Sequence, residues 1–127
     1  MKLIELDPEW KSLSVTISDG GTRNGITRQA GEEIVGMTTP ESFAEAQGIW
    51  FDCPKCTPEG RGHGVLVWFA GRVPAVMPGG LGVDSDGKQV RWTPTGTGFS
   101  DLSLSPSIHI KTGCGWHGHV TSGEITG

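Results

Sequence analysis

Three cysteines and one histidine in this chain have the types and spacing of a tetrahedral metal site. Cys53 and Cys56 form a Cys-x-x-Cys pair, and Cys114 is followed three residues later by His117. Thiolates and imidazoles in two such pairs, separated by a long gap, are the ligands of closed zinc sites. The sequence therefore predicts a Zn²⁺ site formed by Cys53, Cys56, Cys114 and His117.

The residues around these cysteines favour the tight turns that such a site needs. Pro54 fixes φ at the first central position of the turn between the two thiols of the CPKC segment. Gly113 and Gly115 flank Cys114 and remove side-chain crowding where the chain must bend around an ion. Each half of the motif is thus expected to present its ligands from a turn.

Two further histidines leave the ligand set open. His119 and His63 are alternative ligands, or hydrogen-bonding partners of the ligands. Iron is an alternative metal, because tetrahedral thiolate sites accept it. A redox pair formed by Cys53 and Cys56 is a third interpretation, but the odd number of cysteines and the lack of a βαβ pattern argue against it.

The number of protein ligands decides between a structural and a catalytic role. Four protein ligands leave no position for water or substrate, so the predicted site stabilises the fold and no catalytic residue is assigned. The alternative is a metal-dependent hydrolase, in which His119 or His63 replaces a cysteine and an open position holds water. Glu124 or Asp52 would then act as the general base.

Composition places the chain among small soluble β-rich domains. The 127 residues suffice for one domain with a core, and 21 glycines with 8 prolines indicate short strands and many turns. A net charge of −4 without a basic cluster makes nucleic acid an unfavourable partner. No apolar run is long enough to span a membrane, and the first residues do not resemble a signal peptide.

Alternating apolar residues and turn signals predict a mainly β protein: a compact antiparallel sheet or sandwich with zinc-knuckle turns and one short helix. The helix is expected over residues 39–47, where Pro40 follows a threonine N-cap. Asp-Gly within residues 84–88 predicts a hairpin turn, and Pro106 predicts an edge or an interruption in its strand. The expected strands are residues 13–17, 49–51, 64–70, 89–93, 102–110 and 116–121.

We expect a single domain, residues 1–127. Residues 1–48 would form a peripheral N-terminal arm, and residues 49–127 a zinc-stapled β core.

Five segments, taken in order, resemble a family of small uncharacterised zinc-binding β proteins from tailed phages and bacteria. They are GIWFDCPKC, GHGVLVWF, WTPTGTG, DLSLSPSI and GCGWHGHVTSGEI. The resemblance covers about residues 48–125 and implies a zinc-bound β domain in a phage or prophage setting. Members often carry the transferred label "ammonia monooxygenase", which the sequence does not support, since copper oxygenases of that name are membrane proteins.

Together these features predict a non-catalytic, zinc-stabilised structural or protein-binding module. The resemblance suggests an accessory or virion-associated component of a phage, in the decoration, head or tail. Expected partners are phage structural proteins or further copies of the chain. Thiolate ligands suit the reducing cytoplasm of a host, from which the protein could enter a virion.

Overall fold

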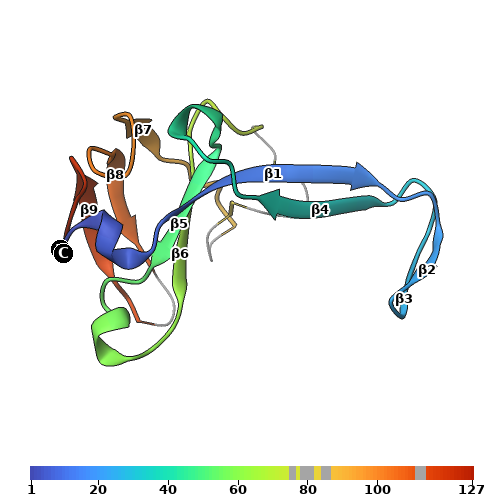
Figure 1. Ribbon diagram of the computed structural model, residues 1–127, viewed down its shortest axis with the longest axis horizontal. Helices are drawn as coiled ribbons and strands as arrows, with labels where there is room; N and C mark the ends of the chain where they lie inside the picture. Colours follow the sequence, from blue (N-terminus) through green and yellow to red (C-terminus); the bar gives the residue numbers. More distant parts are fainter. Residues whose placement is uncertain (75–76, 78–81, 84–86, 111–113) are drawn as a thin grey trace.

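The computed structural model describes residues 1–74, 77, 82–83, 87–110 and 114–127. Its strands form two four-stranded antiparallel sheets and one small hairpin, so the predicted mainly β, antiparallel fold is confirmed (Figure 1). No helix in the described part of the chain is long and apolar enough to cross a membrane. The hairpin turn predicted at residues 84–88 includes positions 84–86, which lie outside the described residues.

The first sheet has the strand order β4-β1-β5-β6. Its strands are β1 (Glu9–Ile17), β4 (Glu33–Thr38), β5 (Gly48–Asp52) and β6 (Gly64–Trp68). β1 pairs with β5 only through its first three residues, and the rest of the strand pairs with β4. β1 and β4 therefore extend away from the body of the molecule and end in a small hairpin, β2 (Gly21–Arg23) and β3 (Ile26–Arg28) (Figure 1).

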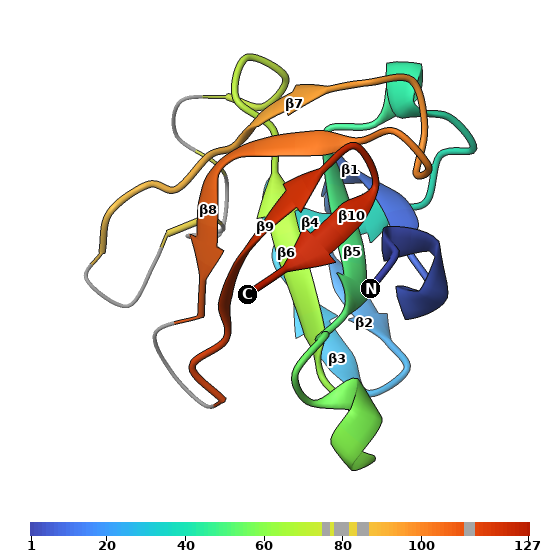
Figure 2. The same ribbon diagram turned by 90° about the vertical axis from the view of Figure 1, so that its left-hand side faces the viewer.

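The second sheet has the order β10-β9-β8-β7 and packs across β5 and β6 (Figure 2). Its strands are β7 (Thr93–Thr95), β8 (Ser103–His109), β9 (His117–Thr121) and β10 (Glu124–Thr126). The ladder between β8 and β9 shifts register between Leu104 and Ile108, on either side of Pro106. Proline has no N–H to donate, so the interruption predicted there is found, although β8 is an inner strand of its sheet.

The core lies between the two sheets. Alternate residues of β5 and β6 point inward, and they meet apolar residues of β8, β9 and β10. The Phe51 and Trp116 rings make an edge-to-face contact with centroids 6.3 Å apart. The N-terminal segment also enters this core, because Leu3 and Leu6 of the short 3-10 helix η1 (Leu3–Leu6) are fully buried. Within the expected peripheral arm 1–48, the part that projects from the body is the β1–β4 ladder with the β2–β3 hairpin at its end (Figure 1).

The helix predicted over residues 39–47 is reduced to the three-residue 3-10 helix η2 (Phe43–Glu45). Tertiary hydrogen bonds end it early, since the Gln47 amide donates to the Lys11 carbonyl and brings the chain into the sheet. Gly48, which directly follows the predicted helix, begins β5. A side chain at that position would meet the Val67 carbonyl oxygen at 2.6 Å, so only glycine fits.

Candidate metal centre

The first two thiols lie in a knuckle that joins β5 to β6. Ile49 and Phe51 point into the core. Cys53, two residues after Phe51, points to the same side of the strand. The turn is held by hydrogen bonds from the Thr57 amide to the Cys53 carbonyl (3.0 Å) and from the Arg61 amide to the Cys56 carbonyl (3.0 Å). Both thiols are consequently buried, with exposures of 0% for Cys53 and 2% for Cys56.

Strand register places His63 opposite Cys53. The β5–β6 ladder ends with the pair Asp52 and Gly64, and the Cys53 amide then donates to the His63 carbonyl at 2.9 Å. Residues directly opposite in an antiparallel pair project from the same face. The His63 side chain therefore points toward the same side of the hairpin as the Cys53 thiol.

Cys114 comes from the other sheet, in the connection between β8 and β9. The Ile110 amide donates to the Trp116 carbonyl at 2.7 Å and continues the β8–β9 ladder toward this connection. The Lys55 ammonium donates to the Cys114 carbonyl at 2.8 Å, so the knuckle and this connection are in direct contact. The Cys114 thiol is half-buried.

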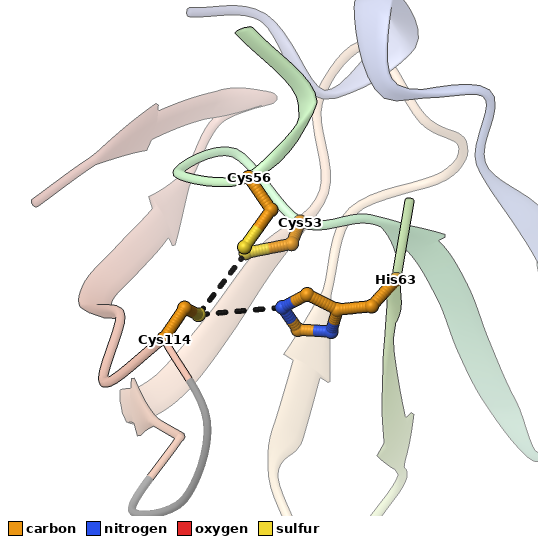
Figure 3. Close-up of side chains that lie close together, drawn as sticks. All are labelled: Cys53, Cys56, His63 and Cys114. Carbon is orange, nitrogen blue, oxygen red and sulfur yellow. Dashed lines mark hydrogen bonds between the residues drawn. The ribbon is translucent and has the colours of Figure 1, made fainter. Parts of the chain in front are cut away.

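Four donor atoms converge at this point. The ligand atoms of Cys53, Cys56, His63 and Cys114 all lie within 4.8 Å of one another. Figure 3 shows the four side chains directed toward a common centre. The Cys53 and Cys114 sulfurs are 3.6 Å apart, and His63 Nε2 is 3.3 Å from the Cys114 sulfur.

These separations fit a single tetrahedral ion. Two sulfur ligands each about 2.3 Å from one zinc at tetrahedral angles lie about 3.8 Å apart, and a nitrogen and a sulfur slightly less. His63 also has a suitable orientation, since its Nδ1 lies 3.2 Å from the Gly64 carbonyl oxygen. A proton on Nδ1 would make that hydrogen bond and leave the Nε2 lone pair free to bind a metal.

The electrostatics of the cluster favour one thiolate even without an ion. The Trp116 backbone N–H and His63 lower the pKa of the Cys114 thiol to about 6. Burial, followed by hydrogen bonds to the neighbouring thiols, raises the pKa of Cys56 to about 11. Buried thiols this close together cannot all ionise unless a cation compensates their charge. A divalent metal supplies that compensation, and Lys55 and Arg61 add positive charge at the rim.

The histidine predicted as fourth ligand, His117, lies elsewhere. It begins β9 next to the inward-facing Trp116, and strand alternation turns its side chain to the outer face of the sheet. There its Nε2 is 2.9 Å from the Ser107 hydroxyl, and its ring stacks on His109 with centroids 4.7 Å apart. The Cys-x-x-His spacing implied a turn through residue 117, but the strand starts at that residue.

Among the described residues, none of the other acids and histidines singled out in the sequence, apart from His63, belongs to the group of donors. His119 is exposed on β9, two residues beyond His117 on the same face. Asp52 is half-buried at the end of β5, and the Glu124 carboxylate lies 3.7 Å from the N-terminal ammonium group. Only His63, considered as an alternative ligand, joins the three cysteines among the described residues. What brings His63 to the cysteines is the register of the β5–β6 hairpin, which places it opposite Cys53. Spacing along the chain does not reveal that register.

The chain was compared with known protein families, curated proteins and solved structures. No protein-family model, no curated protein and no solved structure matches the chain.

Proposed function

We propose that this protein is a non-catalytic, zinc-stabilised module with a structural or protein-binding role. The observation that carries the proposal is the convergence of three thiols and one imidazole within 4.8 Å. The proposed ligands are Cys53, Cys56, Cys114 and His63, with His63 in place of His117. A set of four protein donors is the pattern of structural zinc sites, whereas catalytic sites keep a position for water.

A structural role is supported by where the donors come from. Three belong to the β5–β6 hairpin, and the fourth belongs to the connection between β8 and β9 on the facing sheet. A metal there would tie the two layers together at one end of the sandwich. Structural zinc sites contribute about 10–16 kcal/mol to folding, which is comparable to the whole stability of a small domain.

A role within a phage remains part of the proposal. Its support is the ordered set of five sequence motifs that resemble small zinc-binding proteins of tailed phages. On this interpretation the protein folds in the reducing cytoplasm of a host, where its thiols stay available to the metal. It then acts as an accessory or virion-associated component through contacts with phage structural proteins or with other copies of itself.

The grouping of donors favours this closed site over a metal-dependent hydrolase. The hydrolase interpretation needs His63 or His119 to substitute for a cysteine and so to free a coordination position. His63 instead lies beside all three cysteines, and His119 lies on another face.

The test is metal analysis of the native protein, followed by cobalt substitution. We expect one zinc per chain and the intense visible absorption of tetrahedral Co²⁺ with thiolate ligands. A protein that is folded without any metal would overturn the structural-zinc proposal. A weak spectrum typical of five-coordinate cobalt would show a water position and restore the hydrolase interpretation.

A further inference from the structure

The arm that projects from the body is a two-stranded ribbon with one apolar face. We define the arm as residues 12–38, which comprise the outer part of β1, the β2–β3 hairpin and β4 (Figure 1). In its β1–β4 ladder, Leu13 is opposite Met37, and Val15 is opposite Val35. Opposite residues share a face, so these four side chains lie together, with Ile17 at the outer end. We call Leu13, Val15, Ile17, Val35 and Met37 the apolar arm face.

The other face of the ribbon is mostly polar. Its six positions, from the body outward, are Ser12 with Thr38, Ser14 with Gly36, and Thr16 with Ile34. The ribbon is therefore amphipathic, with the period of two that marks a strand covered on one side only.

The apolar arm face is not an extension of the protein's own core. At the base of β1, Trp10 points into the core, so the even-numbered side of the strand faces the body. The Ser12 hydroxyl on that side donates to the Glu45 carbonyl at 3.0 Å. The apolar residues of the arm occupy the odd-numbered side, whose residues at the base of the strand are Glu9 and Lys11. Because the apolar side of the strand changes between Trp10 and Leu13, the arm directs its apolar face away from the core.

The apolar arm face is open in the single chain. Val15, Ile17 and Met37 are exposed by 46%, 63% and 49%. Isolated two-stranded ribbons are marginally stable in water, and contiguous apolar patches on soluble proteins mark interaction surfaces. A partner that covers this face would stabilise the extended arm.

We propose that the partner is a second copy of this chain, with the two apolar arm faces packed antiparallel about a twofold axis. The charges on the face support this arrangement. Lys11 lies at the base of the odd-numbered side, and Glu33, opposite Ile17, lies at its outer end. Glu33 has no ion pair among the described residues.

The two ends of the face are thus complementary to each other. In the antiparallel arrangement, the outer end of each arm meets the base of the other, so each Glu33 faces the Lys11 of the other copy. Lys11 already forms an ion pair with Glu9 at 3.3 Å and a hydrogen bond with Thr39 at 3.1 Å, and its ammonium group has a third N–H with which to reach a second carboxylate. Parallel packing would instead place Glu33 against Glu33, which like-charge repulsion disfavours.

The size of the surface sets the expected affinity. Six residues of ribbon extend over about 20 Å, which is small for a permanent interface. We therefore expect a reversible dimer with a dissociation constant in the micromolar range.

The test is sedimentation of the purified full chain over a range of concentrations up to about 100 μM, which spans association in this range. The wild-type protein should pass from monomer to dimer. Val15→Lys should raise the dissociation constant by more than about tenfold, because it buries a charge in the apolar contact. The matched control is Thr16→Lys, which places the same charge on the adjacent residue and the opposite face, and it should dimerise like the wild type.

Charge reversal tests the antiparallel arrangement. Glu33→Lys should weaken the dimer, and the double variant Lys11→Glu with Glu33→Lys should recover part of the loss. A wild-type chain that stays monomeric throughout, or equal effects of Val15→Lys and Thr16→Lys, would overturn the proposal. Metal content measured on the same samples separates this proposal from the zinc site, because a Val15→Lys monomer should keep its metal.

Discussion

His63 presents its Nε2 atom to three thiols while its Nδ1 lies beside the Gly64 carbonyl oxygen. His117, at the Cys-x-x-His spacing, contacts Ser107 and His109 instead. Both histidines are exposed, so burial does not distinguish them. The distinction is one of orientation: His63 shares a strand face with Cys53, and His117 lies on the outward face of β9.

Replacement of each histidine tests this assignment. His63→Ala should weaken zinc binding by more than about a hundredfold, since even residues that only support metal ligands contribute 10–100-fold. His63→Cys should retain tight binding, because it preserves four donors, and it should red-shift the d–d bands of the cobalt protein and strengthen its sulfur-to-cobalt charge-transfer absorption. Affinity is measured by competition with a coloured chelator.

The control for this experiment is His117→Ala, which should bind zinc like the wild type. The reverse result, a large loss in His117→Ala and none in His63→Ala, would return the fourth ligand to the position that the motif spacing suggested.

At the scale of elements, two tight turns of the same type differ in their surroundings. Asn24-Gly25 joins β2 to β3, and Ser122-Gly123 joins β9 to β10. All four residues have positive φ, and both glycines have φ of 78°. This is the type I′ geometry that suits two-residue hairpins. A side chain at position 25 would meet nothing within 4 Å, whereas at position 123 it would clash with the Ser100 carbonyl oxygen.

The pair of turns separates backbone strain from crowding. Gly25→Ala should lower the free energy of unfolding by about 1 kcal/mol, which is the strain of an alanine in the left-handed conformation. Gly123→Ala carries the same strain and must also displace the Ser100 backbone, so we expect a loss of more than about 3 kcal/mol. Urea unfolding at equal metal loading measures both. If the two variants lost the same free energy of unfolding, the backbone at Ser100 would have to move aside at no cost in free energy, and the expected effect of crowding would be wrong.

At the scale of the whole molecule, the proposed metal closes a contact between residues far apart in the chain. Cys53 and Cys114 are 61 positions apart, and their sulfurs are 3.6 Å apart. The apolar core joins the same two sheets, so the metal and the core act on one cooperative unit. Closing so long a loop is unfavourable in the unfolded chain, and the metal bonds offset this entropy.

Metal removal should therefore unfold the body of the protein. With a strong chelator we expect the loss of near-ultraviolet circular dichroism from the buried Trp10 and Trp116, and its return when zinc is restored. Cys114→Ala should fail to fold stably for the same reason. A folded, metal-free Cys114→Ala protein with a native spectrum would show that the core alone suffices.

Local patterns accounted for much of the fold. The alternation within residues 13–17 and 102–110 was found as parts of β1 and β8, and the interruption at Pro106 was found as a register shift. The predicted helix, residues 39–47, was too long, because Pro40 and its threonine N-cap report only on the local preference of the chain. Pairing of β5 with β1 brings residues 46–48 into extended structure, and this long-range contact cannot be read from propensity.

The sequence by itself determined the β class, the positions of β1, β5, β6, β8 and β9 and the three cysteine donors of the candidate site, because alternation and Cys-x-x-Cys turns are local properties of the chain. The strand expected over residues 89–93 was not found, since Gln89 and Trp92 form only isolated bridges. Only the tertiary structure decided which histidine joins those donors and which side of β1 faces solvent. Both depend on register, and a shift of one residue moves every side chain of a strand to the other face. Register is set by pairing between strands, which for His63 and for the arm involves residues that no local motif connects.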